Sequence, residues 1–212
     1  MDIKVNAHSS IFITEKNKKI FVDPFMIKEG KNQADYIFIT HSHYDHFSPE
    51  DILKVANKKT IFVAPVSLKA EILRLNVKEE NLYLVFPNDI IVLEGFKAIA
   101  IPSYNLKEKF HEKESKFVGY LFDFFTTKVY VAGDTDYIPE MKEVKCDIAL
   151  VPIGGKYTMD YKDASQFIND VKPKIAIPTH YGSIVGKITD GTDFKNSLDK
   201  SVQVKLLIGG NQ

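Results

Sequence analysis

The sequence contains a single cysteine, Cys146, so no disulfide can form within the chain. Cys146 stands beside the apolar run 148–151, which favours a place in the core over a role as a nucleophile. No run of about 18 or more consecutive apolar residues occurs, and the first residues lack the charged leader and apolar segment of a secretory signal. These absences lead us to expect a cytoplasmic protein that does not span a membrane.

The chain also lacks an excess of charge, because 28 Lys and Arg residues balance 28 Asp and Glu residues. Nucleic acids and anionic membrane surfaces usually require a basic patch, so we expect neither as a partner. No linker of distinct composition and no internal repeat divides the 212 residues. With 44% hydrophobic and 26% charged residues, the sequence predicts one compact domain over residues 1–212, with a frayed tail at 209–212.

The most informative stretch is residues 40–46, where His41, His43, Asp45 and His46 follow an apolar strand. Alternate residues of an extended chain point to the same side, so the first two histidines and Asp45 can share one face, and a turn would add His46. Neutral imidazole nitrogens and a carboxylate oxygen suit zinc, manganese or iron. The pattern predicts a metal site at a strand end, and a metal-free histidine-rich loop is the alternative.

Apolar runs bounded by turn residues predict short strands along the chain, with few helices between them. Ser48, Pro49 and the two acidic residues that follow form a typical helix start. Further helices are expected at 162–171 and 192–199, and a last strand at 202–208. Strands accompanied by helices, without strict alternation, favour an α/β (α+β) fold of two mixed sheets packed face to face, with helices on the outer faces.

Other candidate ligands also stand where strands are expected to end. Gly133 follows the apolar strand 128–132 and would let the chain turn there and expose Asp134. His180 follows the strand 174–178 in the same manner. Because ligands of open sheets collect beyond the strand ends, Asp134 and His180 are candidates to join the histidine cluster.

These residues and their neighbours resemble those of the metallo-β-lactamase-fold hydrolases. Within that superfamily the chain is similar to the short bacterial and archaeal branch that includes the ascorbate-6-phosphate lactonases and uncharacterised metal-dependent hydrolases. The resemblance extends over nearly the whole chain, and the motif at 39–46 is its most specific part. The other matching stretches are at 7–9, 22–25, 132–135, 151–155 and 177–182.

The resemblance implies a four-layer αβ/βα sandwich around a site with two metal ions. His41, His43 and a third histidine would bind the first ion. The ligands of the second would be Asp45, His46 and His180, and Asp134 would bridge the two ions.

The third histidine of the first ion is an open question. In relatives it follows directly after a strand that resembles residues 96–103, but here Tyr104 and Asn105 stand at that place. His111 comes six residues after Asn105, and the loop 103–116 could fold it back to the site. We expect His111 to be the ligand, with Asn105 in the usual place as the alternative.

Such a site implies hydrolysis of a small ester, lactone or phosphodiester by a metal-bound hydroxide, with zinc as the expected metal and manganese or iron as alternatives. Asp45, Asp134 and His8 are the expected catalytic residues. The small-molecule substrate could be anionic, because Lys156 stands beside a matching stretch. The sequence predicts no oligomeric state.

Supporting roles are assigned by closeness to the motifs. Asp23 and Asp136 could accept hydrogen bonds from ligand histidines, although a purely structural role fits either residue equally well. His8, Tyr157 and Tyr181 are candidates to protonate the leaving group, with packing as the alternative for each.

Two other classes of function stay open at this point. Related scaffolds with iron perform redox chemistry, and a site that lacks the usual third histidine could suit one iron ion. A non-catalytic metal-binding domain is the other alternative. Nuclease members of the superfamily carry an additional domain or arm for RNA, and 212 residues without net charge leave little room for one.

Overall fold

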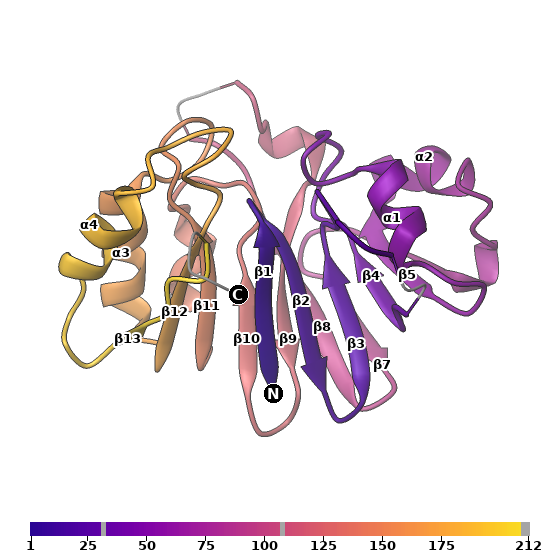
Figure 1. Ribbon diagram of the computed structural model, residues 1–212, viewed down its shortest axis with the longest axis horizontal. Coiled ribbons are helices and arrows are strands. Elements are labelled where there is room, and N and C mark those ends of the chain that lie inside the picture. The colour runs from indigo at the N-terminus through magenta and orange to yellow at the C-terminus, as the bar shows by residue number, and fades with distance from the viewer. Residues whose placement is uncertain (31–32, 107–108, 209–212) are drawn as a thin grey trace. The chain divides into compact units, whose positions relative to one another are not determined.

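The computed structural model describes residues 1–30, 33–106 and 109–208, and the chain forms two compact units, Met1–Val85 and Phe86–Gln212. Each unit contains one mixed β-sheet and its own helices (Figure 1). The two mixed sheets with helices that the sequence predicts are therefore confirmed. The organisation as a single domain stays a prediction, and the tail at 209–212 lies outside the described residues.

The sheet of the first unit has the strand order β1-β2-β3-β4-β5-β6. Strands β1 to β3 are antiparallel, whereas β3 to β6 run parallel to one another. The strands are β1 Asp2–Ala7, β2 Ser10–Glu15, β3 Lys18–Val22, β4 Tyr36–Phe38, β5 Ile61–Pro65 and β6 Leu82–Val85. The helical segments are α1 Pro49–Val55, η1 Val66–Leu68, α2 Lys69–Leu73 and η2 Glu79–Asn81.

Strand β4 is the central support of this unit. It lies between β3 and β5, and all three of its residues are buried, which explains its continuously apolar sequence. Ile37 of β4 belongs to one core cluster with Ile52 and Val55 of α1 and with Ile72 of α2. The strand that leads into the histidine motif is thus held in place by neighbouring strands and by helices.

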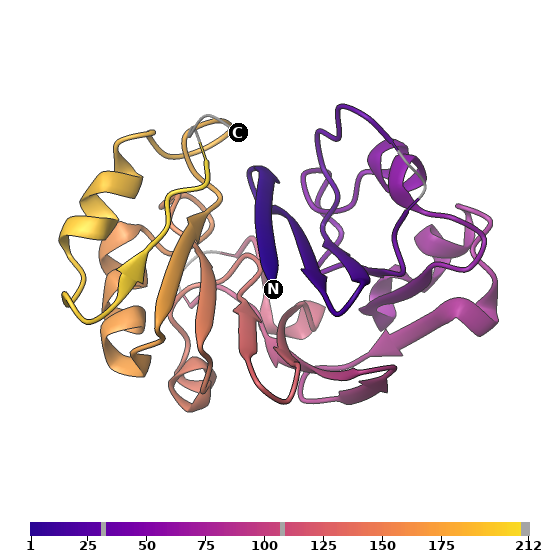
Figure 2. The same cartoon turned by 60° about the horizontal axis from the view of Figure 1, so that its bottom comes forward.

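The sheet of the second unit has the order β13-β12-β11-β10-β9-β8-β7. Strands β7 to β10 are antiparallel, and β10 to β13 are parallel (Figure 2). The strands are β7 Ile90–Leu93, β8 Phe96–Pro102, β9 Val118–Asp123, β10 Lys128–Val131, β11 Ile148–Pro152, β12 Ile175–Thr179 and β13 Gln203–Val204. The helical segments are η3 Lys113–Ser115, η4 Pro139–Glu143, α3 Tyr161–Val171 and α4 Asp190–Asn196.

The last strand is much shorter than the stretch 202–208 that the sequence predicts. The backbone N–H groups of Gln203 and Lys205 donate to the carbonyls of Lys174 and Ala176 on the side of β12. Every second residue of β12 directs both its N–H and its carbonyl toward β13. After residue 176, the next such residue is 178, which is proline and has no N–H to donate. The predicted extent was wrong because a residue of the neighbouring strand ends the pairing.

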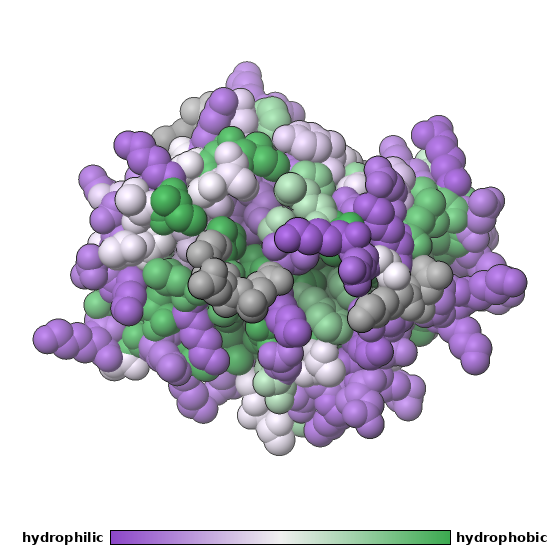
Figure 3. All heavy atoms as spheres, viewed as in Figure 1, coloured by the Kyte–Doolittle hydropathy of each residue, from purple (hydrophilic) through white to green (hydrophobic). Residues whose placement is uncertain are grey.

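Apolar side chains gather in a core within each unit. On the face drawn in Figure 3, hydrophilic side chains surround smaller hydrophobic areas. Large hydrophobic side chains that are exposed include Tyr44, Leu53, Ile90 and Val92. None of the helices within the described ranges is long and apolar enough to cross a membrane.

Helix α1 follows the histidine motif and begins as its sequence predicts, with Ser48 as N-cap and Pro49 in the first turn. The carboxylate of Asp51 accepts hydrogen bonds from the backbone N–H groups of Met26 (2.8 Å) and Ile27 (3.0 Å). Lys54 pairs with the same carboxylate at 3.0 Å. Asp51 thereby ties the loop after β3 to the helix.

Neutralising Asp51 should destabilise the first unit. Burial raises the pKa of Asp51, but the hydrogen bonds from Lys54, Ser48 and the backbone lower it more, so this pKa lies below its usual value of 3.8. The stabilisation is therefore present above the unfolded-state pKa and is lost as the pH falls through the folded-state pKa. We expect Asp51→Asn to lower the free energy of unfolding at pH 7 by about 1–3 kcal/mol in urea titrations.

The matched control for this prediction is Glu50→Gln. Glu50 pairs with the same lysine at 3.0 Å, but its side chain is 83% exposed. Exposed ion pairs contribute little, so this variant should unfold at nearly the same urea concentration as the unchanged protein. Equal destabilisation by both substitutions would contradict the role of Asp51 in holding the loop.

Candidate metal centre

The histidine motif of the first unit lies in a turn between β4 and α1. The backbone N–H groups of His46 and Phe47 both donate to the carbonyl of His43, at 2.9 and 2.7 Å. This turn brings the ring of His46 to 4.0 Å from the ring of His41, measured between centroids, and the His43 ring lies 4.7 Å from His41. His41 and His46 are buried, and His43 is half-buried.

The simple alternation expected for an extended chain does not describe this cluster. His41 has both His43 and His46 as neighbours, whereas Asp45 lies beside His46, with their Oδ2 and Nε2 atoms 3.7 Å apart. The reason is that the turn begins at His43, before the chain reaches the carboxylate. His46 therefore stands between the two groups.

Asp23 is the hydrogen-bond acceptor behind the motif. It follows β3, is 1% exposed, and accepts from the backbone N–H of Thr40 (2.8 Å), the Thr40 hydroxyl (2.6 Å) and Nδ1 of His46 (2.7 Å). Burial raises the pKa of Asp23, and the hydrogen bonds with His46 and Thr40 oppose that rise without cancelling it. The structure thus brings Asp23 to the motif, as its position in the sequence suggested.

Two histidines of the motif have a defined tautomer as a result. A carboxylate can only accept, so Nδ1 of His46 is the protonated nitrogen. The Thr40 hydroxyl donates to Asp23, and its oxygen lies 2.9 Å from Nδ1 of His41, from which it can accept. In both rings the lone pair is then on Nε2, which is the arrangement that metal-ligating histidines have.

His8 joins the first unit's cluster from the turn between β1 and β2. Its Nε2 atom lies 3.1 Å from Oδ2 of Asp45, and its side chain is buried. One ligand atom from each of His8, Asp45 and His46 lies within 4.8 Å of the others. This group of two imidazoles and a carboxylate could bind a metal ion.

In the second unit, Asp134 and His180 follow the parallel strands β10 and β12, which lie on either side of β11, at the same edge of the sheet. Nε2 of His180 lies 3.0 Å from Oδ2 of Asp134, and both residues are buried. Gly133 has φ 67°, which provides the turn expected before Asp134. At the end of β11, Gly154 leaves space for His180, because a Cβ there would collide with the His180 carbonyl oxygen.

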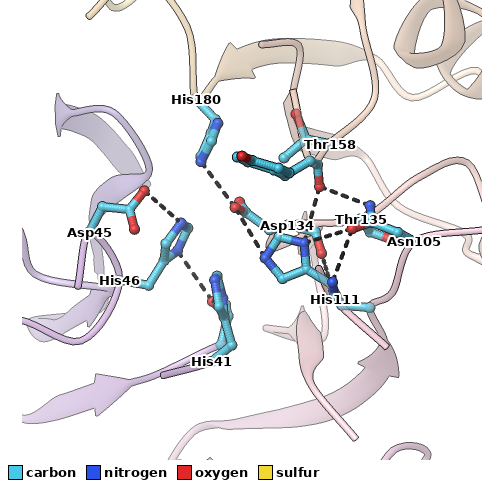
Figure 4. Close-up of polar contacts among 12 residues, drawn as sticks. His41, Asp45, His46, Asn105, His111, Asp134, Thr135, Thr158 and His180 are labelled. Carbon is cyan, nitrogen blue, oxygen red and sulfur yellow. Dashed lines mark hydrogen bonds and ion pairs between the residues drawn. The ribbon is translucent and has the colours of Figure 1, made fainter. Parts of the chain in front are cut away.

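His111 is the third member of the second unit's cluster. Its side chain is fully buried, and its Nε2 atom lies 3.7 Å from Oδ2 of Asp134. Nδ1 of His111 faces two oxygens, Oδ1 of Asn105 at 2.9 Å and the carbonyl of Tyr157 at 3.1 Å (Figure 4). The structure therefore brings His111 to Asp134 and places Asn105 behind the histidine ring.

The remaining candidates support the loops of the second unit. Asp136 accepts from Nδ2 of Asn105 (3.1 Å) and from the backbone N–H of Leu106 (2.7 Å). The Tyr157 ring stacks on Phe110, with 3.9 Å between centroids. Tyr181 is buried in the core, and burial together with the charge of Asp190 raises its pKa, which makes it a poor proton donor.

Two functional residues were missed by sequence reasoning or given another role. The Thr40 hydroxyl accepts a hydrogen bond from His41 and donates one to Asp23. In the sequence, only its position directly before the motif suggests this role. The sequence suggests Asn105 only as an alternative ligand. In the structure its amide contacts His111, Asp136 and Tyr157, and spacing along the chain does not identify these partners.

The donor set of each unit fits a divalent metal ion of borderline character. Both sets consist of imidazoles and carboxylates that are buried except for the half-buried His43, and the Nε2 atoms of His46, His111 and His180 lie 3.0–3.7 Å from a carboxylate oxygen. The thiol of Cys146 is a poor metal ligand at neutral pH, because burial raises its pKa to about 12. This chemistry suits zinc, manganese or iron more than a metal that prefers sulfur.

Comparisons with known proteins agree with this geometry. Residues 2–180 match the family described as the Beta-lactamase superfamily domain. A UPF0173 metal-dependent hydrolase of Nanoarchaeum equitans, NEQ378, is 31% identical over 98% of this chain and 96% of its own length. The crystal structure of a proposed metal-dependent hydrolase from Parabacteroides distasonis ATCC 8503 is 30% identical, with a TM-score of 0.83 over 96% of this chain and 91% of that chain.

A more distant structure shows how widely the fold is used. CmlA, a diiron β-hydroxylase from Streptomyces venezuelae, has a TM-score of 0.79 at 15% identity, over 97% of this chain and 52% of that chain. At that identity the likeness concerns the fold alone. The narrower resemblance to ascorbate-6-phosphate lactonases stays a prediction. The matched family and the relatives of similar length show that the chain belongs to the beta-lactamase superfamily of metal-dependent hydrolases.

Proposed function

We propose that the protein hydrolyses a small ester, lactone or phosphodiester with the help of two metal ions, of which zinc is the first choice. The observation that carries this proposal is the set of hydrogen bonds that place the lone pairs of His46 and His111 on Nε2. Histidines held in this way, next to buried carboxylates, are typical of metal ligands.

The proposed ligands come from both units. The first unit contributes the four ligands of its motif, His41, His43, Asp45 and His46. The second unit contributes His111, Asp134 and His180. The proposal that these residues serve one pair of ions, with Asp134 as the bridge, is supported by family membership and by the ligand chemistry within each unit.

When bound, such ions polarise a scissile carbonyl or phosphoryl group and make water acidic enough to react near neutral pH. The side chains of the protein would orient the water and supply a proton to the leaving group. Asp45 accepts a hydrogen bond from the attacking water and so directs it to the substrate. His8, 3.1 Å from Oδ2 of Asp45, holds that carboxylate in its orientation and can supply a proton to the leaving group.

Two lysines of the second unit could attract a small substrate with a negatively charged part. A cavity of about 760 Å³ is lined by Lys142 and Lys156 and also by Asp136, Asp160 and Asp163. Two of these aspartates are engaged by N–H donors, since Asp136 accepts from Asn105 and Leu106 and Asp160 caps α3. The three carboxylates outnumber the two lysines, so the lysine ammonium groups themselves, and not the net charge of the lining, would attract an anion.

Iron-dependent redox chemistry is the alternative from another class, and a non-catalytic metal-binding domain is a third. Imidazoles and carboxylates also bind iron, and the fold is shared with a diiron enzyme. Metal analysis of the purified protein separates the three. Zinc or manganese near two per chain supports hydrolysis, and iron near one per chain with dioxygen uptake supports the redox alternative. No bound metal, with no loss on replacing Asp134, supports a non-catalytic or degenerate domain.

Removing a proposed ligand from either unit should abolish turnover. We expect His43→Ala and Asp134→Ala to lower kcat/KM for a lactone or phosphodiester substrate by on the order of 10³-fold, because charge stabilisation at the reacting group is lost. Both variants should stay folded by circular dichroism. The matched control, Asp193→Ala on the exposed surface of α4, should retain activity.

Metal content of the same variants tests the bridging role. If Asp134 bridges two ions, Asp134→Ala should lose more than one metal ion per chain, whereas His43→Ala should lose about one. Full turnover in both variants, with unchanged metal content, would overturn the proposed function.

Asp23→Asn should weaken zinc binding by about 10–100-fold, which is the usual effect of altering a residue that orients a ligand histidine. The amide keeps the size of the carboxylate, but its NH2 group must face either Thr40 or His46, and both donate hydrogen bonds to Asp23. Chelator competition measures the affinity. Asp35→Asn, on an exposed aspartate that also accepts a backbone N–H, is the control and should bind zinc normally; unchanged affinity in Asp23→Asn would contradict the assigned role.

A further inference from the structure

We propose that Asn105 is a positioning residue that selects the Nδ1–H tautomer of His111 and thereby directs Nε2 of that ring toward Asp134. This proposal rests on the proposed role of His111 as a metal ligand. It concerns residues of the second unit only, and it assigns to Asn105 a role different from that of a ligand.

Asn105 closes the loop that carries His111. Its backbone N–H donates to the carbonyl of His111 at 2.8 Å, and the backbone N–H of His111 donates to Oδ1 of Asn105 at 3.1 Å. Oδ1 also lies 2.9 Å from Nδ1 of the ring. One carbonyl oxygen therefore contacts both the backbone and the side chain of His111, and it holds the residue at two points.

The orientation of the Asn105 amide follows from its other partners. Nδ2 lies 2.8 Å from the carbonyl of Tyr157 and 3.1 Å from Oδ1 of Asp136. Both partners can only accept a hydrogen bond, so the NH2 group must face them. The oxygen then faces His111, and Nδ1 of His111 must be the donor.

The carbonyl of Tyr157 is a second acceptor for the same ring nitrogen, at 3.1 Å. That carbonyl also receives the Nδ2 hydrogen bond from Asn105, and Tyr157 has φ 65° in the left-handed region. Asn105 thus holds the second acceptor in place as well as providing the first. Losing Asn105 weakens both hydrogen bonds to the ring, although the Tyr157 carbonyl itself is retained.

An amide is the only common side chain of this size that supplies one acceptor and two donors. A carboxylate at position 105 would bring an oxygen to about 3 Å from the Asp136 carboxylate and the Tyr157 carbonyl, and like charges at that distance repel. If Asn105 were itself a ligand, a carboxylate would be the better one. Asn105→Asp therefore gives opposite results under the two roles.

The test uses the full chain, first without metal and then with zinc as the probe. The tautomer of His111 is read from the ring nitrogen shifts of the 15N-labelled metal-free protein, and zinc affinity is read by chelator competition. We expect Nδ1–H in the unchanged protein. Asn105→Ala should give a mixture of tautomers and about 10-fold weaker zinc binding, and Asn105→Asp should weaken zinc binding at least as much.

Tyr104→Phe is the matched control for a merely structural effect. The Tyr104 hydroxyl donates to Glu140 at 2.9 Å and receives a hydrogen bond from Lys113 at 3.3 Å, so it fastens the same loop without contacting the His111 ring. This variant should lose stability and keep the Nδ1–H signal of His111. An equal change of tautomer in Tyr104→Phe would reduce Asn105 to a loop-closing residue and overturn the proposal.

Two further outcomes would also overturn the proposal. One is tighter zinc binding by Asn105→Asp, which would make residue 105 a ligand. The other is an unchanged tautomer and affinity in Asn105→Ala. Failure of the proposed function is recognised separately, because His111→Ala would then bind zinc normally while the tautomer measurement on the metal-free protein still decides the role of Asn105.

Discussion

The hydrogen bond between Asp23 and Nδ1 of His46 is the constraint on which the first unit's candidate centre depends. Strands β3 and β4 are parallel neighbours, and Asp23 and Thr40 follow them at the same edge of the sheet. The backbone of Asp23 donates to Phe38, and its carboxylate accepts from Thr40 and His46. Removing a carboxylate from water is costly, and these donors offset the cost. The sheet therefore sets the orientation of the motif through one buried acid.

The second unit meets the same requirement with neutral acceptors. His111 faces an amide oxygen and a backbone carbonyl, whereas His46 faces a carboxylate. A carboxylate acceptor makes the imidazole a stronger base and adds a negative charge near the metal. Neutral acceptors fix the tautomer without that charge. The two histidines thus have different electrostatic surroundings, although the lone pair lies on Nε2 in both rings.

Four residues at or beside the candidate centres have a left-handed backbone conformation, which also occurs in turns elsewhere in the described chain. His8, Asp23, Tyr157 and His180 all have positive φ, between 48° and 65°, a conformation that side chains other than glycine rarely adopt. Such conformations persist where surrounding contacts enforce them and are often associated with function. Hydrogen bonds supply that enforcement here for Asp23 and Tyr157, each of which accepts a hydrogen bond from a histidine of a candidate centre. The sequence alone does not reveal that these four residues have a positive φ.

Residue types and their spacing by themselves determined the ligand chemistry, the buried strand before the motif, the helix start at Ser48 and the positions of Asp134 and His180 at strand ends. These are local properties, because hydrophobic runs, caps and turns depend on neighbours in the chain. Only the tertiary structure showed that His111 lies beside Asp134 and that Asn105 lies behind the His111 ring. Asn105 is held by hydrogen bonds to Asp136 and Tyr157, which lie 31 and 52 positions further along the chain. Likewise, Pro178 of a neighbouring strand ended β13. Such outcomes depend on which donors and acceptors meet in space, and spacing along the chain does not specify that.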